Sequence, residues 1–184
     1  MIEYIPKTIM KPAHLIEVPS AWKGLESILF DIIKEFKLDR KTAVEFGVEY
    51  GYSTAALANY FERVIGVDTF TGDVHSGKRS SFYEQTQDNL KEFKNIFLIK
   101  KDYKEFIESE DNKNAKIDLS HIDIVHNYAE TYECGLWAAK HSKVAIFHDT
   151  MTFSEVRRAV EDIAKEVGKT FYNYPNYCGL GIIK

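Results

Sequence analysis

From Thr42 onward, short apolar runs alternate with amphipathic stretches, and this alternation constrains the fold more than any other feature of the sequence. Apolar runs of this length indicate buried strands, whereas apolar residues at three- and four-residue spacing indicate helices. Strands joined by helical crossovers form a parallel sheet with helices on both faces. The expected strands lie at residues 43–46, 64–67, 96–99, 117–122 and 144–147, and the expected helices at residues 53–61, 81–93, 103–109, 128–140 and 154–167.

The C-terminal part of the chain predicts a hairpin. Two extended stretches, residues 170–174 and 180–183, flank Pro175-Asn176-Tyr177, whose proline and asparagine favour a turn. A connection this short pairs strands antiparallel. The fold class is therefore α/β, a Rossmann-like doubly wound sheet in three α/β/α layers, mostly parallel with an antiparallel C-terminal strand.

The N-terminal region differs in composition from the rest. Residues 1–20 carry Pro6, Pro12 and Pro19, and prolines suppress regular structure, so we expect an irregular arm. Ser20 is the predicted N-cap of an amphipathic helix that continues to Phe36. No linker-like stretch divides the remainder, which predicts a single domain over residues 21–184.

Composition and charge narrow the function classes. The 184 residues are 45% hydrophobic, enough for one core, and the net charge of −4 gives no basic excess for a nucleic-acid partner. No stretch approaches the roughly 20 apolar residues of a membrane-spanning helix, and the N-terminus lacks a signal-peptide pattern. We expect a cytoplasmic protein that acts on a small molecule, without a nucleic-acid or membrane partner, and leave open whether it forms a homo-oligomer.

The strongest local signal is the sequence EFGVEYGYST at residues 45–54, a predicted strand that runs into a turn with two glycines and then a helix. In a doubly wound sheet such a turn lies at the carboxyl edge, where ligands bind. Gly47 and Gly51 allow the backbone to approach a ligand, and Ser53 or Thr54 caps the helix. An ordinary strand-to-helix turn without a ligand is the alternative.

The charge of this turn indicates which ligand it suits. Dinucleotide sites use G-x-G-x-x-G and leave the helix N-terminus free for a pyrophosphate, whereas this chain has E-x-G-x-x-x-G. Glu45 at the strand tip would repel a pyrophosphate but attract the ammonium and sulfonium of S-adenosylmethionine.

Acids at the ends of the next two predicted strands extend this hypothesis. Asp68 is positioned to accept both ribose hydroxyls, with turn capping as the alternative. Asp102 is a candidate for the adenine amino group or, equally, a helix N-cap. The predicted cofactor-binding residues are Glu45, Phe46, Gly47, Gly51, Ser53, Thr54, Asp68, Thr69, Asp102 and Asp123.

Polar residues also follow the fourth and fifth strands of this series. Asp123, His126, His148 and Asp149 should converge on the same cleft. Methyl transfer to oxygen requires removal of the hydroxyl proton, and His126 is the candidate base, because an unperturbed histidine titrates near neutral pH, with Asp123 as the second catalytic residue. A histidine that only packs at a strand end is the alternative.

The same cluster suggests a second chemistry. Asp123, His148 and Asp149 form a candidate site for a divalent metal ion, and their mixed imidazole and carboxylate donors suit manganese, iron or zinc better than magnesium. The loop after Asp68 contains Asp73 and His75, which we interpret either as a wall over the ligand or as a solvated loop.

Five motifs in order carry a family resemblance: EFGVEYGYST, VDTFTGDVHSG, HIDIVHNY, FHDT and CGLGII. From about Thr42 to the C-terminus the chain resembles class I S-adenosylmethionine-dependent methyltransferases of methyltransferase domain family 24. The resemblance implies a seven-stranded sheet whose last strand is antiparallel, cofactor contacts at Glu45, Gly47 and Asp68, and His126 near the acceptor.

Metal dependence is implied less clearly by this resemblance. Some related O-methyltransferases hold a metal with acids at the positions of Asp123 and Asp149. Val125, however, stands where many relatives carry an acid, and this weakens the metal hypothesis. Ser142-Lys143 replaces the usual Pro-Gly-Gly before the fifth strand of the series.

Together these features predict an enzyme that uses S-adenosylmethionine to methylate a small acceptor, with O-methylation of a sugar or similar hydroxyl as the expected reaction. The N-terminal arm, with His14 and Trp22, is the candidate acceptor lid. A non-catalytic module that binds S-adenosylmethionine or S-adenosylhomocysteine is the alternative. An NAD-dependent oxidoreductase is disfavoured by Glu45 and by the missing third glycine.

Overall fold

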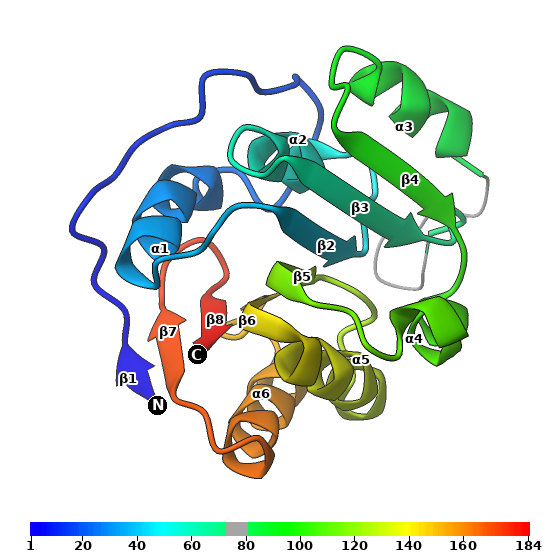
Figure 1. Ribbon diagram of the computed structural model, residues 1–184. Coiled ribbons are helices and arrows are strands. Elements are labelled where there is room, and N and C mark those ends of the chain that lie inside the picture. The colour runs from blue at the N-terminus through cyan, green and yellow to red at the C-terminus, as the bar shows by residue number, and fades with distance from the viewer. Residues whose placement is uncertain (73–80) are drawn as a thin grey trace.

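The computed structural model describes residues 1–72 and 81–184, and within these ranges eight strands form one sheet in the order β1-β7-β8-β6-β5-β2-β3-β4 (Figure 1). Five neighbouring strands, from β6 to the edge strand β4, pair in parallel where the sequence predicted them, with ends that differ by at most two residues. They are β2 (Thr42–Phe46), β3 (Arg63–Asp68), β4 (Ile96–Lys100), β5 (Ile117–Ile122) and β6 (Ser142–His148).

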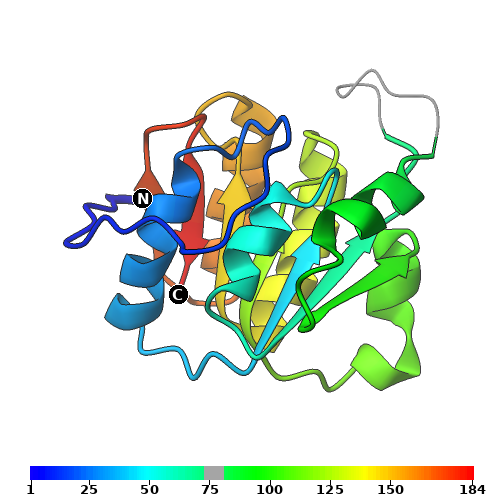
Figure 2. The same cartoon turned by 90° about the horizontal axis from the view of Figure 1, so that it is seen from above.

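Helices cover both faces of the sheet, so the predicted three-layer architecture is confirmed (Figure 2). Successive residues of a strand face opposite layers, and accordingly Ala43 belongs to one apolar core while Val44 and Phe46 belong to the other. On one face lie α1 (Leu29–Glu35), α2 (Tyr52–Ala58) and α3 (Tyr83–Leu90), and on the other α4 (Tyr103–Glu108), α5 (Tyr128–His141) and α6 (Ser154–Glu166).

The predicted C-terminal hairpin is confirmed. Strand β8 (Leu180–Ile183) inserts between β6 and β7 (Phe171–Tyr174) and runs antiparallel to both. The turn between β7 and β8 contains Tyr177, Cys178 and Gly179, all with positive φ. The last strand of the chain is therefore the antiparallel one, as the family resemblance implied.

The N-terminal region departs from expectation in two ways. Ile2–Glu3 forms a short strand, β1, that pairs in parallel with β7 at the sheet edge, so the sheet has eight strands rather than seven. The predicted helix also begins late: Gly24 has a φ of 108°, and only after it do a 3-10 turn, η1 (Leu25–Ile28), and α1 follow. Ser20 is not a helix cap, and its Oγ instead accepts a hydrogen bond from the Trp22 amide at 3.1 Å.

The junction between α5 and β6 explains how the fold tolerates Ser142-Lys143. Helix α5 ends at His141 and β6 begins at Ser142, so the chain passes directly from helix to strand. Ser142 Oγ lies 2.5 Å from Ser120 Oγ on β5, and Lys143 Nζ lies 2.8 Å from Asp118 Oδ1. None of the described helices is long and apolar enough to cross a membrane.

Candidate active site

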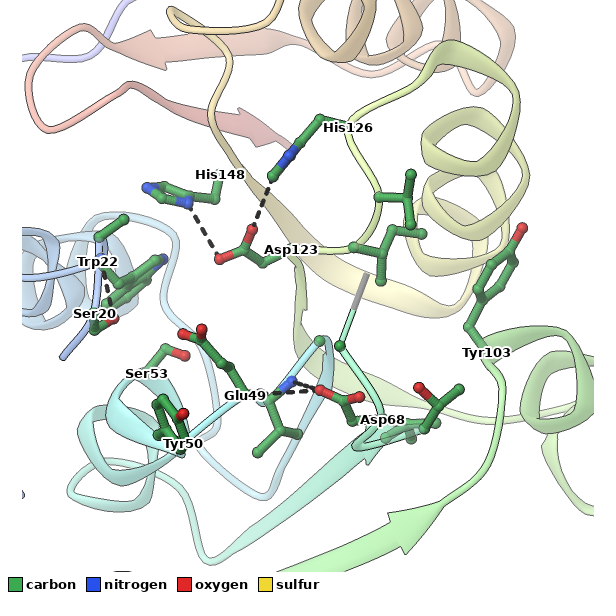
Figure 3. A pocket seen from close by; sticks show the side chains of 18 of the residues that line it. Ser20, Trp22, Glu49, Tyr50, Ser53, Asp68, Tyr103, Asp123, His126 and His148 are labelled. Atoms are coloured by element: carbon green, nitrogen blue, oxygen red, sulfur yellow. Dashed lines mark hydrogen bonds and ion pairs between the residues drawn. The ribbon is translucent and has the colours of Figure 1, made fainter. Parts of the chain in front are cut away.

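A cavity of about 650 Å³ opens at the carboxyl edge of the sheet, where β2, β3, β5 and β6 end (Figure 3). One residue at the end of each strand lines the cavity. These residues are Gly47 after β2, Asp68 at the end of β3, Asp123 after β5 and Asp149 after β6. Strand order reverses between β2 and β5, and such switch points are where doubly wound sheets bind ligands. The predicted convergence of these strand ends is therefore observed.

Gly47 brings the ends of β2 and β5 into close contact. Its φ is +88°, and a Cβ at this position would lie 1.8 Å from the carbonyl oxygen of Asp123. Only glycine fits there without moving the backbone. Gly51 also has a positive φ and precedes α2, but a Cβ there would meet Leu90, and Gly51 is not among the described residues that line the cavity.

Asp68 is held by the backbone of the glycine-containing turn. Its Oδ2 accepts hydrogen bonds from the amides of Val48 and Glu49 at 2.8 and 2.9 Å, and its Oδ1 accepts one from Phe70 at 2.7 Å. A carboxylate offers about four acceptor positions, so one remains for a ligand hydroxyl. Asp68 therefore both fixes the turn and presents an oriented acceptor to the cavity.

Thr69 and Asp102 also line the cavity; Thr69 follows Asp68 directly, and Asp102 lies just beyond the end of the neighbouring strand β4. Asp102 Oδ1 accepts a hydrogen bond from the amide of Lys104 at 2.9 Å, which makes it the N-cap of α4. The N-cap alternative is thus confirmed, and the residue lines the cavity as well.

Six of the ten predicted cofactor residues line the cavity, namely Gly47, Ser53, Asp68, Thr69, Asp102 and Asp123. Phe46 is fully buried and packs edge-on against Phe106 and Trp137, on the face covered by α4 and α5. Thr54 is also fully buried, within α2. The sequence therefore located the turn correctly but could not distinguish which of its side chains reach the cavity.

Glu45 occupies a place different from the one predicted for it. Its side chain is 0% exposed and is not among the described cavity-lining residues. One carboxylate oxygen lies 2.8 Å from His121 Nδ1, and the other accepts a short hydrogen bond from Thr54 Oγ1. The expected direct contact with the cofactor has no support in this geometry, because the side chain is fully buried and does not line the cavity.

The opposite side of the cavity holds two carboxylates and two histidines. His126 Nε2 lies 2.9 Å from Asp149 Oδ2 and 3.6 Å from Asp123 Oδ1. His148 Nδ1 lies 3.1 Å from Asp123 Oδ2 and 3.3 Å from Asp149 Oδ2. The His126 ring stacks on Phe153 at 4.3 Å, so its orientation is fixed by packing as well as by charge.

These contacts change the protonation of the cluster. Burial alone would lower the pKa of His126, but hydrogen bonds to Asp123 and Asp149 outweigh it and raise the pKa to about 10. The pKa of His148 is also raised, since the charge of Asp123 outweighs burial. Burial would raise the pKa of Asp123, but His148 and His126 hold it well below its usual range. His126 is therefore mainly protonated at neutral pH, contrary to the titration argument made from the sequence.

The cluster offers two groups of potential metal donors. In one, ligand atoms of Asp123, His126 and Asp149 lie within 4.8 Å of one another, and in the other those of His148, Asp149 and Cys178 do. The predicted set of Asp123, His148 and Asp149 is thus brought together, but the first group includes His126 in place of His148. Mixed imidazole and carboxylate donors fit manganese, iron or zinc better than magnesium.

The sequence missed most of the aromatic side chains around the cavity. Trp22, Tyr50, Tyr52, Tyr103 and Phe153 all line it, and they come from the N-terminal region, the turn before α2, α2 itself, α4 and the segment before α6. The spacing of these aromatic residues in the sequence does not distinguish them from aromatic residues of the core.

Two further residues, Glu49 and Trp22, line the cavity, whereas His14 does not lie among the described lining residues. Glu49 lines the cavity and lies within the recognised turn, where its charge could have identified it. Of the two arm residues proposed as a lid, Trp22 lines the cavity, whereas His14 lies at α2, where its amide donates to Asn59 Oδ1 at 2.9 Å. Asp73 and His75 lie outside the described residues.

The fold and the site define a class of protein, a Rossmann-like α/β enzyme that binds its ligand at the switch point of the sheet. The sequence matches the family model described as "Methyltransferase domain" over residues 44–150, more than half of the chain. The chain belongs to this family and is an S-adenosylmethionine-dependent methyltransferase.

Solved structures share the fold at low sequence identity. A candidate caffeoyl-CoA O-methyltransferase from Staphylococcus aureus is 17% identical, with a TM-score of 0.66 over 92% of this chain and 86% of that one. An O-methyltransferase from Bacillus cereus in complex with S-adenosylhomocysteine is 18% identical, with a TM-score of 0.65 over 94% and 83%. A candidate RNA methyltransferase from Pyrococcus horikoshii is 20% identical, with a TM-score of 0.53 over 92% and 90%. No curated protein sequence matches the chain.

Proposed function

We propose that this methyltransferase transfers the methyl group to a hydroxyl of a small molecule, a sugar or a similar compound. The single observation that carries the proposal is the division of the cavity, with Asp68 on one side and Asp123 and His126 on the other (Figure 3). His126 also pairs with Asp149, which completes the Asp123–His126–Asp149 cluster. The first side suits the nucleoside, and the second offers acid–base chemistry for the acceptor. Two of the similar structures are named O-methyltransferases, which agrees with this reaction.

The charge of the cavity supports a cationic cofactor, although Glu45 does not line it. The described lining residues include Lys101 and the two histidines, against a larger set of carboxylates. An excess of negative charge favours a sulfonium and an ammonium, and opposes a pyrophosphate. The carboxylates of the lining are Glu49, Asp68, Asp102, Asp123, Glu130 and Asp149.

In the proposed reaction the acceptor oxygen attacks the methyl carbon in line with the departing sulfur. The carbon–sulfur bond breaks, its electrons remain on sulfur, and S-adenosylhomocysteine results. The hydroxyl proton passes to His126 in its neutral form, and Asp149 then stabilises the imidazolium at 2.9 Å. Because the pKa of His126 is about 10, the neutral form is the minority at pH 7, and transfer should accelerate as the pH rises toward 10.

A divalent cation is a second candidate occupant of the cluster, because Asp123, His126 and Asp149 can supply three donors. When bound, such an ion would lower the pKa of the acceptor hydroxyl. It would also compete with the proton on His126. Metal dependence should therefore appear as loss of transfer on chelation and as a shift of the pH profile to lower pH when manganese is restored.

The test is transfer of a tritiated methyl group from S-adenosylmethionine to a panel of sugars and catechols. Wild-type protein should label at least one acceptor, and His126→Ala should label it at least about 10²-fold more slowly. Binding of S-adenosylhomocysteine without transfer to any acceptor, including those in a cell extract, would instead favour the non-catalytic module.

A further inference from the structure

Trp22 is tied to the interior of the sheet by a chain of buried polar contacts. Its indole Nε1 lies 3.0 Å from Nε2 of His121 on β5, and His121 Nδ1 lies 2.8 Å from Glu45 on β2. Thr54 Oγ1 on α2 donates to the other oxygen of Glu45. All four side chains are essentially excluded from solvent. The chain therefore links the N-terminal region to the two central strands and to α2.

The donor and acceptor roles in this chain are determined by chemistry. An indole N–H can only donate, so His121 Nε2 must be the acceptor and carry no proton. The remaining ring proton is then on Nδ1 and is donated to Glu45, which makes His121 neutral. Glu45 and His121 are directly opposite each other in the β2–β5 pairing, which sets the distance between them.

Trp22 is the end of this chain that reaches the cavity. It lines the cavity with Ser20, whose Oγ accepts from the Trp22 amide, and it lies on the same side as His148 (Figure 3). The indole also packs against the His121 ring at a centroid distance of 5.1 Å. Its position is thus fixed from the strand side by one hydrogen bond and by ring packing.

We propose that Glu45 and His121 are positioning residues that hold Trp22 as a rigid wall of the cavity, and that Glu45 does not contact the cofactor. The inference rests on the proposed function only for the identity of the molecule that meets this wall. Glu45, the acid of the EFG motif, would then shape the cavity indirectly, because it holds the neutral His121 ring that in turn holds Trp22. Loss of either positioning residue should loosen Trp22 while leaving the Asp68 side of the cavity intact.

The experiment uses the fluorescence of Trp22 in a Trp137→Phe background, since Trp22 and Trp137 are the only tryptophans in the sequence. Acrylamide should quench Trp22 weakly in this background. His121→Leu and Glu45→Leu should each increase the quenching constant at least about twofold, because a freed indole becomes accessible to solvent. Shielded fluorescence in a folded His121→Leu variant would overturn the proposal.

Glu45→Gln is the matched variant. Glutamine can accept from His121 and donate to Thr54, so it preserves the chain but removes the charge. Quenching of Trp22 and calorimetric affinity for S-adenosylhomocysteine should both match the background protein. A weakening of that affinity by about tenfold, with Trp22 still shielded, would mean that the Glu45 charge acts on the cofactor and would refute the positioning role.

A measurement on the unmodified chain covers the case in which the leucine variants fail to fold. Nitrogen-15 NMR of the histidine rings at neutral pH should give one ring with a protonated Nδ1 and an unprotonated Nε2. The His121→Asn variant identifies that ring by its disappearance. The opposite tautomer at His121 overturns the proposal, whereas failure of wild-type protein to bind S-adenosylhomocysteine affects the proposed function alone.

Discussion

Two carboxylate–histidine clusters lie near the end of β5, and they differ in access to water. The interior cluster consists of Glu45 and His121, and the edge cluster consists of Asp123, His126, His148 and Asp149. His121 lies within the strand and pairs with Glu45, and both side chains are 0% exposed. Asp123 follows the strand and contacts His126 and His148, with 26% and 16% of the Asp123 and His126 side chains exposed. The same residue types therefore stabilise the interior around His121 and face the ligand cavity around Asp123, because the strand ends between these two residues, at Ile122.

The two clusters also differ in protonation. His121 accepts from an indole N–H and faces one carboxylate, which requires the neutral ring. His126 faces two carboxylates, which raise its pKa to about 10 after the opposing effect of burial. The comparison predicts that the edge cluster controls chemistry and pH response, whereas the interior cluster controls stability and cavity shape.

Removal of His126 should have the largest effect on activity. His126→Ala should reduce kcat/KM for methyl transfer by about 10²- to 10⁴-fold, the range for loss of a general base. His141→Ala is the matched control, because His141 stacks on Trp137 and is not among the described cavity-lining residues. Equal losses in both variants would contradict the division between the clusters.

The pH dependence of stability should also come from the edge cluster. A pKa raised in the folded state contributes stability that is complete below the unfolded value near 6.5 and is lost as the pH rises through about 10. The free energy of unfolding in urea should therefore decrease from pH 7 to pH 10. His126→Gln should flatten that decrease, and an unchanged slope would show that His126 is not its source.

Gly47→Ala should sharpen the comparison by pushing the ends of β2 and β5 apart. The added Cβ would lie 1.8 Å from the Asp123 carbonyl oxygen, so the free energy of unfolding should fall by about 3 kcal/mol or more. Gly168→Ala is the control, since its φ is also positive but no atom lies within 4 Å of the added Cβ. That variant should lose only about 1–2 kcal/mol, and similar losses would refute the importance of the close approach.

The smallest effect is expected in the interior cluster. Thr54→Val removes the hydroxyl that donates to Glu45, and the unsatisfied carboxylate oxygen should lower the free energy of unfolding by about 1–3 kcal/mol. Affinity for S-adenosylhomocysteine should stay the same in calorimetry. Thr152→Val, at an exposed residue, provides the control for stability, and a loss of affinity in Thr54→Val alone would assign Thr54 to the cofactor site.

Much of this fold could be predicted because strand and helix periodicities differ. The five parallel strands and the C-terminal hairpin follow from local apolar runs and a turn. Strand β1 could not be predicted, because two residues are too few to show the alternation of apolar and polar residues that marks a strand. Its pairing with β7 joins the two ends of the chain, and no local pattern reveals it. Ser20 was predicted to cap the first helix, but helical structure begins only at Leu25. Gly24, with its positive φ, interrupts the helix before that point.

The site was predictable to the level of strand ends and not to the level of side-chain direction. Asp68, Asp123, His126 and Asp149 reach the cavity because each lies at or beyond a strand end. Glu45 lies before the end of β2, and only the register with His121 reveals that its carboxylate turns inward. The raised pKa of His126 likewise depends on two acids from different strands.

The central claim is that strand-end carboxylates at the carboxyl edge meet the cofactor, whereas buried carboxylates elsewhere maintain the fold. Titration of S-adenosylhomocysteine into Asp68→Asn and Asp118→Asn tests it most directly, because Asp118 lies at the opposite end of β5 and holds the amides of Lys41 and Thr42. Asp68→Asn should weaken binding about tenfold or more, and Asp118→Asn should leave it unchanged. Unaltered binding in Asp68→Asn, or equal weakening in both variants, would contradict the claim.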